Sequence, residues 1–360
     1  MSRARSAGRV GAMLISRPED VGYLTGFTGG DGLLLMGGGA GRSAGWAVLI
    51  TDGRYEEQAG AECDGVEIHI RSGSVAAAVA EALKGRGVRR LGCQADDMTI
   101  RFRRTLASTV GEKRLKPVCD VIAPLRRVKD AGEIAAISRA VRVAERAFRQ
   151  LIAGGKSALI GRTERRVAAE LEYRMRLAGS DGAAFQTIVA AGPNSSLPHH
   201  RPGARKIRRG ECVLLDFGAV VGGYCSDLTR VVFTGKIPPK LVEIYELVRR
   251  AQAAGIAAIR PGATCRSVDA AAREVIAAAG YGDRFLHGVG HGIGRQVHEA
   301  PAMGRTGRLR LRAGEVVTVE PGLYLPGFGG VRIEDNILVT PRGRRRLSSL
   351  PRKLAAVTLA

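Results

Sequence analysis

The stretch HGVGHGIGRQVHE, from His287 to Glu299, places three of the chain's six histidines among four glycines. A glycine inside a helix costs about 1 kcal/mol relative to alanine, so no regular helix is expected here. Glycine at this density indicates a backbone that passes close to another group or adopts positive φ. Imidazoles on such a segment are candidate metal ligands or acid–base groups. The simpler alternative is a glycine-rich loop with incidental histidines.

Two aspartates lie on a predicted apolar hairpin. Residues 211–219 (ECVLLDFGA) and 224–233 (YCSDLTRVVF) have the pattern of paired strands around a glycine turn. If the turn is centred at the Val221–Gly222 bond, Asp216 and Asp227 lie directly opposite one another, with Cβ atoms about 5 Å apart. Such a pair is unfavourable unless a cation or a proton lies between the carboxylates.

Two glutamates repeat this arrangement near the end of the chain. Residues 315–324 (EVVTVEPGLY) and 331–339 (VRIEDNILV) resemble strands joined by a turn centred near Gly327. Glu320 and Glu334 are then cross-strand partners, provided that no bulge shifts the register.

Four carboxylates and one imidazole make up the ligand inventory of a two-metal hydrolase site with bridging carboxylates. Oxygen-rich ligands without a thiolate favour Mn²⁺, Co²⁺ or Fe²⁺ as strongly as Zn²⁺. The alternative, four unrelated solvated acids, requires two coincident pairings on apolar hairpins.

Size and composition allow two domains in a soluble globular chain of 360 residues. The formal charge of +22 fits either an anionic partner such as RNA or a generally arginine-rich surface. The basic residues are scattered and aromatic residues are sparse, which favours the second interpretation and predicts at most weak, salt-sensitive RNA binding.

The six cysteines show no CxxC spacing and are expected to be reduced, mostly buried thiols. No signal peptide or membrane span is recognisable, so we expect a cytoplasmic protein. The segment 1–12 is expected to be disordered.

The first part of the chain has the pattern of an α/β domain. Strands are predicted at 46–51 and 66–70 and a helix at 75–83. Two prolines and a basic run within 117–129 predict a domain boundary, which we assign between domain 1–124 and domain 125–360. Asp130 and Glu133 then form a capping box for a helix that extends to about Ile152.

The second part contains a faint internal repeat. Residues 154–179 resemble residues 260–280, each with a glycine turn, a Ser or Thr before an amphipathic helix, and a terminal glycine. Two similar halves that face each other would place a site between them.

Taken together, the motifs resemble the creatinase/aminopeptidase P/prolidase family of metallopeptidases. The matching segments are LPHHRPG (197–203), LLDFGA (214–219), YCSDLTR (224–230), HGVGHGIGRQVHEAP (287–301), VTVEPGLY (317–324) and GGVRIED (329–335). VGYLTGFTG (21–29) and TDGRYEEQA (51–59) resemble the family's N-terminal domain. The resemblance implies an α+β protein: a C-terminal pita-bread domain, with helices around a curved antiparallel sheet and pseudo-twofold halves, preceded by a smaller creatinase-like α/β domain.

The resemblance also implies a set of site residues. The five dinuclear metal ligands would be Asp216, Asp227, His291, Glu320 and Glu334. Asp227 and Glu334 would bridge the two ions, and His291 would bind one ion only. His199, His287 and His298 match histidines that line the substrate site, whereas His200 is adjacent to a motif position. The expected cofactor is two divalent ions, above all Mn²⁺, with Co²⁺, Zn²⁺ or Fe²⁺ as alternatives.

The implied reaction is hydrolysis of an Xaa-Pro peptide bond by a hydroxide that bridges the two metals. Glu320 is expected to move the proton, and His287 or His298 to donate to the oxyanion. His199 is expected on the wall that selects proline by shape. Arg332 lies on the strand face of Glu334, where it could orient a ligand carboxylate, meet a substrate carboxylate or form an ordinary ion pair.

Several alternatives stay open at this point. Prolidases cleave dipeptides and need a cation for the free carboxylate, for which Arg308, Arg310 and Arg332 are possible; aminopeptidase P cleaves longer peptides. A related aminopeptidase with non-proline specificity, or a non-catalytic pita-bread module that binds peptide or RNA, are the other possibilities. The family resemblance further implies a homodimer.

Overall fold

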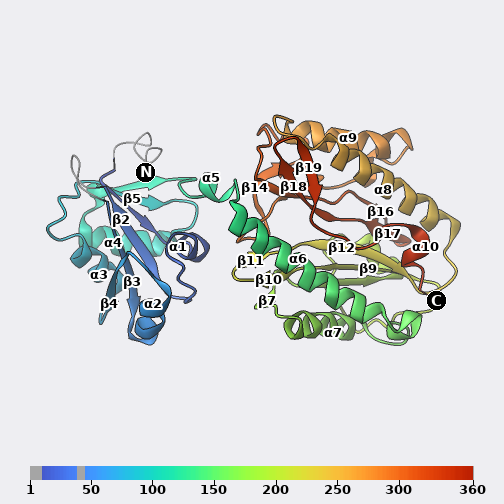
Figure 1. The fold of residues 1–360 in the computed structure, drawn as a ribbon, viewed down its shortest axis with the longest axis horizontal. Coiled ribbons are helices and arrows are strands. Elements are labelled where there is room, and N and C mark those ends of the chain that lie inside the picture. Colours follow the sequence, from blue (N-terminus) through green and yellow to red (C-terminus); the bar gives the residue numbers. More distant parts are fainter. Residues whose placement is uncertain (1–9, 39–44, 360) are drawn as a thin grey trace. The chain divides into compact units, whose positions relative to one another are not determined.

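The computed structural model describes residues 10–38 and 45–359 and divides the chain into two compact units, Met1–Arg126 and Arg127–Ala360 (Figure 1). The division falls inside the predicted boundary region 117–129. Most of the segment 1–12 lies outside the described residues, although Ala12 already begins a strand.

The first unit is a mixed six-stranded sheet with helices on both faces, in the strand order β4-β3-β2-β1-β5-β6. Its strands are β1 (Ala12–Ile15), β2 (Leu33–Gly37), β3 (Trp46–Asp52), β4 (Glu67–Arg71), β5 (Leu91–Gln94) and β6 (Leu115–Val118). Its helices are α1 (Pro18–Thr25), α2 (Glu56–Glu62), α3 (Val75–Ala82), α4 (Ile100–Val110) and α5 (Ala123–Arg126).

Alternate residues of the central strands serve two separate cores in this unit. Leu14 packs with apolar residues of α3 and α4, whereas Ile15 packs with residues of α1 and α2. This period of two is what a strand covered on both faces requires. The predicted strands 46–51 and 66–70 and the predicted helix 75–83 are confirmed by β3, β4 and α3.

The second unit wraps helices around antiparallel sheets (Figure 1). Its helices are α6 (Ala131–Ile152), α7 (Glu164–Leu177), α8 (Pro239–Ala258), α9 (Cys265–Ala278) and α10 (Leu354–Val357). Its strands are β7 (Gly182–Ala183), β8 (Ile188–Ala191), β9 (Cys212–Phe217), β10 (Ala219–Val221), β11 (Tyr224–Cys225), β12 (Leu228–Phe233), β13 (Gly290–Gly292), β14 (Glu299–Met303), β15 (Val316–Val319), β16 (Gly322–Leu325), β17 (Gly329–Arg332), β18 (Asp335–Thr340) and β19 (Gly343–Arg346). The capping box at Asp130 and Glu133 is present and starts α6 as predicted.

The predicted internal repeat contains α7 and α9, which are the second helices of two helix pairs, α6 with α7 and α8 with α9. The second helix of each pair begins after a threonine, Thr163 or Thr264, whose hydroxyl accepts a hydrogen bond from the third residue of the helix. Each threonine also forms a β-bridge to a later segment, and each helix ends before a glycine with positive φ, Gly179 or Gly280. The two halves therefore share local geometry as well as sequence.

The predicted register of the first hairpin is wrong, because the turn centre lies one residue further along the chain than predicted. Val221 pairs with Tyr224, so the turn is centred between Gly222 and Gly223 and Asp216 lies opposite Thr229. Both turn glycines have positive φ, the conformation of a two-residue hairpin turn. Asp227 precedes Thr229 by two residues, so the two aspartates are diagonal neighbours and not direct partners.

The second hairpin has the predicted turn centre. Leu325 pairs with Gly329 and Val319 pairs with Asp335, and both pairings are centred on Gly327. Glu320 and Glu334 occupy matching positions in the gap between the two ladders. Their backbone N–H groups donate elsewhere, to the carbonyls of Val289 and Thr229 respectively.

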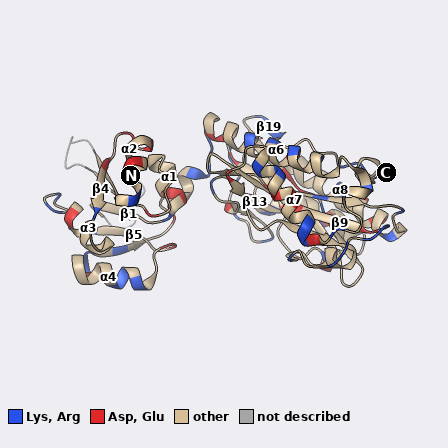
Figure 2. Ribbon diagram, turned by 90° about the horizontal axis from the view of Figure 1, so that it is seen from below, with Lys and Arg blue, Asp and Glu red and all other residues tan. Residues whose placement is uncertain are grey.

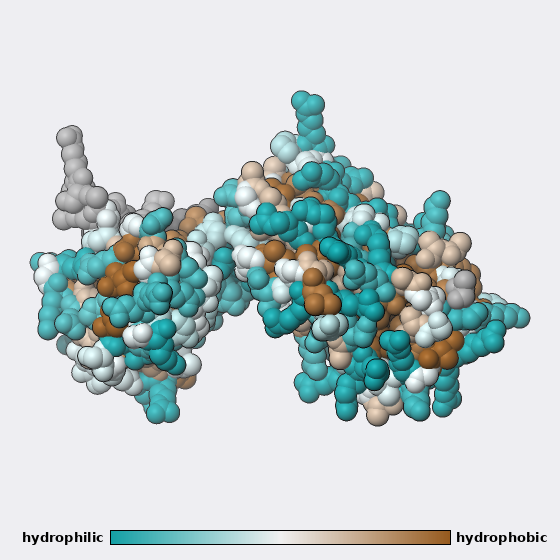
Figure 3. Space-filling model, turned by 60° about the horizontal axis from the view of Figure 1, so that its bottom comes forward, coloured by the Kyte–Doolittle hydropathy of each residue, from teal (hydrophilic) through white to brown (hydrophobic). Residues whose placement is uncertain are grey.

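The surface of the described residues agrees with the expectation of scattered charge. Lysine and arginine occur on both units and do not form one block (Figure 2). Hydrophilic side chains cover most of the face in Figure 3, with small, separate apolar patches. No helix among the described residues is long and apolar enough to cross a membrane. All six cysteines are free, and only Cys119 is exposed, as predicted.

Candidate active site

A pocket of about 310 Å³ in the second unit gathers most of the residues that the motifs single out. Its lining includes Asp216, Asp227, His291, Glu320, His199, His287, His298 and Arg332, together with the apolar side chains of Phe185, Ile188 and Val297. Glu334 is 1% exposed and lies behind the pocket surface. Residues as far apart in the sequence as His199 and Glu334 thus meet in one place.

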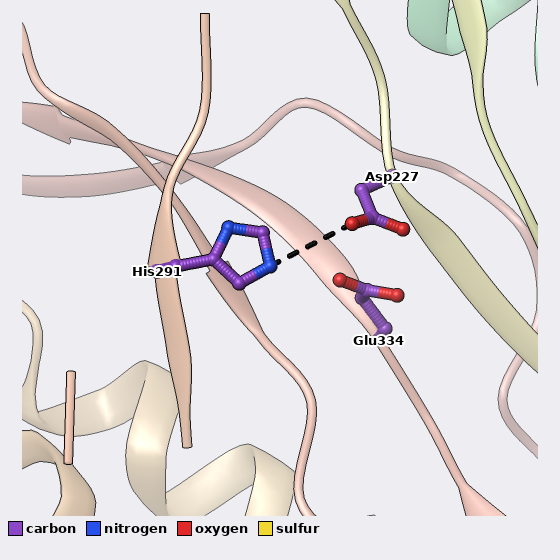
Figure 4. Close-up of side chains that lie close together, drawn as sticks. All are labelled: Asp227, His291 and Glu334. Carbon is purple, nitrogen blue, oxygen red and sulfur yellow. Dashed lines mark ion pairs between the residues drawn. The ribbon is translucent and has the colours of Figure 1, made fainter. Parts of the chain in front are cut away.

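Three of the five predicted ligands form a compact cluster (Figure 4). One donor atom from each of Asp227, His291 and Glu334 lies within 4.8 Å of the other two. The Nε2 atom of His291 is 3.6 Å from Asp227 Oδ2 and 3.3 Å from Glu320 Oε1. This spacing is too long for strong direct hydrogen bonds but suits donors that share a small cation.

The backbone fixes the tautomer of His291. Its Nδ1 atom lies 3.1 Å from the carbonyl of Gly292, where it must donate a proton. In the neutral ring the lone pair is therefore on Nε2, which faces the carboxylates, and this is the tautomer that binds metals. Without an ion, burial lowers the pKa of His291, but the hydrogen bond and charge of Glu320 outweigh burial and raise it overall. The glycines around His291 are needed for close approach: a Cβ at Gly290 would lie 2.1 Å from the Thr318 carbonyl oxygen.

Asp216 is held by a buried arginine. The Nη2 atom of Arg332 donates to Asp216 Oδ2 at 2.6 Å, and the Arg332 side chain is nearly inaccessible to solvent. Of the roles open for Arg332, this contact fits both the orientation of a ligand carboxylate and an ordinary ion pair. The burial of the pair excludes the solvent screening that weakens surface ion pairs.

Thr229 connects Glu334 to Arg332 and was not singled out in the sequence. Its hydroxyl donates to Glu334 Oε2 at 2.9 Å and accepts from Arg332 Nε at 3.1 Å. The signal was available, because Thr229 lies in the DLTR motif, two residues after Asp227, and opposite Asp216. Its recognition required the correct hairpin register.

Tyr324 is the second residue that sequence reasoning missed. Its hydroxyl accepts from Arg332 Nη1 at 2.7 Å and lies 2.9 Å from His287 Nε2. The Nδ1 atom of His287 faces the Gly288 carbonyl at 2.9 Å and must donate there. His287 Nε2 therefore accepts the Tyr324 proton, and both ring nitrogens of His287 are occupied. Burial also lowers the pKa of His287, so the ring is neutral.

His298 differs from His287. Its ring is packed edge-on against His291, with ring centroids 4.3 Å apart, and it has no hydrogen bond among the described side chains. The turn before it is fixed by Glu299, whose Oε1 accepts from the Gln296 N–H and whose Oε2 lies 3.3 Å from the buried ammonium of Lys129. Burial and the neighbouring His291 lower the pKa of His298.

The pocket carries an excess of buried negative charge, which bears on whether these residues could hold a pair of cations. Burial and the adjacent carboxylates hold the pKa of Asp227 and that of Glu334 well above their usual range. Asp216 Oδ1 and Glu334 Oε1 are buried without a hydrogen-bond donor. Four carboxylates face one guanidinium, Arg332. Orphaned acceptors and an excess of negative charge are the conditions that divalent cations relieve.

His199 and His200 lie on a loop that is held by hydrogen bonds to a buried glutamate, Glu164. Glu164, at the start of α7, accepts hydrogen bonds from the Ala191 and Gly203 N–H groups and the Asn194 amide, and lies 2.8 Å from His200 Nε2. His200 is therefore a structural partner of Glu164, whereas His199 faces the pocket. The loop geometry thus separates these two neighbouring histidines.

Replacement of Glu164 by Gln should make stability less dependent on pH. Burial raises the pKa of Glu164, but the hydrogen bonds from Ala191, His200, Asn194 and Gly203 outweigh burial and hold it below 4.5. A depressed folded-state pKa adds stability that is complete above the unfolded value and is lost as pH falls through the folded value. We expect E164Q to be less stable at pH 7 by about 1–3 kcal/mol, and this deficit to shrink below about pH 4.5.

Urea unfolding followed by circular dichroism from pH 7 to pH 3 measures this difference. The exposed Glu274 on α9 provides the control, because E274Q should follow the wild type throughout. A deficit of E164Q that stays constant over the whole range would contradict the assignment.

Comparisons with known proteins identify the family to which the chain belongs. Residues 135–341 match the model of metallopeptidase family M24, and residues 3–128 match the creatinase/prolidase N-terminal domain. The chain is 42% identical to the uncharacterized peptidase YqhT of Bacillus subtilis, over 96% of this chain and 95% of that protein.

Two solved structures are similar over nearly their whole length. The Xaa-Pro dipeptidase from Bacillus anthracis has a TM-score of 0.92 and 37% identity, covering 99% of this chain and 98% of that chain. The X-Pro aminopeptidase from Thermotoga maritima has a TM-score of 0.88 and 34% identity, covering 98% and 99%. These matches confirm the predicted two-part architecture, with a creatinase-like domain before a pita-bread domain. The chain belongs to metallopeptidase family M24.

Proposed function

We propose that this chain is a metal-dependent exopeptidase that hydrolyses the bond between a first residue and a following proline. The observation that carries the proposal is the pocket in which four carboxylates and His291 converge opposite a single guanidinium. The names of the similar structures, an Xaa-Pro dipeptidase and an X-Pro aminopeptidase, support the same specificity.

The proposed metal ligands are Asp216, Asp227, His291, Glu320 and Glu334. Oxygen donors dominate and the described lining of the pocket contains no thiolate, so Mn²⁺ is the ion we favour, ahead of Co²⁺, Fe²⁺ and Zn²⁺. When bound, two such ions would lower the pKa of water in the pocket and polarise the scissile carbonyl.

Glu320 is the proposed general base. Its carboxylate lies 3.3 Å from His291 Nε2 and 3.4 Å from the Thr318 hydroxyl, and it lines the pocket. Burial raises the pKa of Glu320, but the neighbouring His291 outweighs burial and lowers it overall. An ionised Glu320 can accept a proton from the attacking water and pass it to the leaving nitrogen.

His298 is the proposed donor to the developing oxyanion, in preference to His287. Both nitrogens of His287 are engaged, one with the Gly288 carbonyl and one with Tyr324. A neutral His298 retains one N–H that no described residue accepts. His287 then serves to fix Tyr324 and, through it, Arg332.

Selection of proline is assigned to the shape of the pocket. The leaving nitrogen of an Xaa-Pro bond carries no N–H, so a hydrogen-bond acceptor cannot recognise it. The lining of the pocket includes, besides His199, the side chains of Pro198, Phe185 and Ile188, which are apolar surfaces that a pyrrolidine can pack against.

Hydrolysis assays test the proposal directly. We expect purified protein with Mn²⁺ to cleave alanyl-proline or alanyl-prolyl peptides, and to cleave alanyl-alanine at least about 10-fold less efficiently. Addition of EDTA should abolish cleavage, and excess Mn²⁺ should restore it. Cleavage of alanyl-alanine at the same rate as alanyl-proline would instead indicate an aminopeptidase without proline specificity.

A further inference from the structure

A second pocket, of about 510 Å³, adjoins the site and shares Pro198, His199 and His287 with it. The remaining lining consists of Leu197, His200, Arg201 and Leu286. Because the two pockets have three residues in common, a ligand that occupies the first can extend into the second.

The one arginine among the described residues that line the first pocket, Arg332, is already engaged by protein groups. Arg332 donates to Asp216 Oδ2, the Tyr324 hydroxyl, the Thr229 hydroxyl and the Pro198 carbonyl. The other arginines that the sequence suggested for a substrate carboxylate, Arg308 and Arg310, line neither pocket. Arg310 instead donates to the Gly262 carbonyl.

Arg201 is the one arginine in the described lining of the second pocket. Its side chain is exposed, and no hydrogen bond or ion pair joins it to another described residue. The neighbouring His200 lies 2.8 Å from the buried Glu164, which also accepts the Gly203 N–H. The backbone on both sides of Arg201 is therefore held in place while its charge stays available.

Two leucines on the pocket wall are unusually accessible. Leu197 is 53% exposed and Leu286 is 66% exposed. Large aliphatic side chains at the mouth of a pocket favour an apolar ligand group. The pocket therefore combines an apolar surface with one free positive charge.

We propose that Arg201 binds the C-terminal carboxylate of a short peptide substrate, while Leu197 and Leu286 contact its apolar C-terminal residue. This inference rests on the proposed function. The α-carboxyl of a peptide has a pKa of about 3.5, so it is negatively charged at neutral pH and needs a partner when it leaves water. Arg201 is then a specificity-determining residue that favours substrates whose carboxylate reaches the second pocket.

Kinetics on a matched pair of substrates test this role. Alanyl-proline carries the carboxylate, and alanyl-prolinamide lacks its charge. In the variant Arg201→Gln we expect KM for alanyl-proline to rise about 10- to 100-fold, the loss expected for a charge-assisted hydrogen bond. KM for the amide and kcat for both substrates should change less than about 2-fold, and Arg201→Lys should restore part of the difference.

Two controls separate the failure of this inference from that of the proposed function. Arg209→Gln removes an exposed arginine that lines neither pocket and should leave both substrates unaffected. Calorimetric titration of the Mn²⁺-loaded protein with L-proline and L-prolinamide measures binding without any hydrolysis. Weaker binding of L-proline to R201Q supports the carboxylate site even if no peptide is cleaved. If the difference between acids and amides in KM and in binding is the same for R201Q as for the wild type, the inference is wrong.

Discussion

The variant Asp227→Asn should lose Mn²⁺ binding and more than about 100-fold of kcat/KM on alanyl-proline. Residues that merely support a metal ligand change affinity or activity by about 10- to 100-fold, so loss of a bridging ligand should exceed that range. Asp227 lies in the cluster with His291 and Glu334, and the amide of Asn provides no negative charge for two cations.

The same variant should unfold at no lower temperature than wild type when both are free of ions. Burial and the charges of Glu334, Asp216 and Glu320 raise the pKa of Asp227, which means that its ionised form is unfavourable in the folded protein. Its replacement therefore relieves repulsion. Asp283→Asn, at an exposed position in the same unit, is the matched control. Full Mn²⁺ binding by D227N would contradict the proposed ligand set.

The second large effect is expected for Arg332→Met, which retains the approximate length of the side chain but removes its charge. Arg332 is buried and donates to Asp216, Tyr324 and Thr229. Removal of one partner of a buried ion pair destabilises proteins by about 3–5 kcal/mol, because the other charge stays buried without compensation. We expect a loss of this size in the ion-free protein.

Urea unfolding in the presence of EDTA measures this loss. Added Mn²⁺ should recover part of it, because ions at Asp216 replace the missing positive charge. The double variant R332M/D216N provides a check, since removal of both charges should be less destabilising than removal of Arg332 alone. Equal stability of R332M and wild type without ions would show that the pair has no structural role.

Local patterns in the sequence predicted the elements that local rules govern. The capping box at Asp130, helix α3 and the free, mostly buried cysteines follow from propensity, capping and composition. The turn centre at Gly327 was also predicted, because the apolar alternation of both strands leaves one register.

The first hairpin shows why register is difficult to predict. Two adjacent glycines allow a turn centred on either side of Gly222, and the choice moves the partner of Asp216 from Asp227 to Thr229. The sequence therefore did not reveal Thr229 as a link between Arg332 and Glu334.

Contacts between residues that are far apart in the sequence could not be predicted from any motif. The Tyr324 hydroxyl contacts both His287 Nε2 and Arg332 Nη1, and this is why we propose His298 as the oxyanion donor in preference to His287. The same contact shows that Arg332 has no free N–H pair for a substrate. The availability of Arg201 likewise depends on how the loop from 192 to 203 folds around Glu164.

Titration of ion-free protein with Mn²⁺, with hydrolysis of alanyl-proline followed at each addition, tests the central claim most directly. The proposal predicts no hydrolysis before the first addition, and a rate that rises and saturates at about two ions per chain. Hydrolysis at the full rate without ions, or a protein that binds Mn²⁺ and leaves every Xaa-Pro peptide intact, would contradict it.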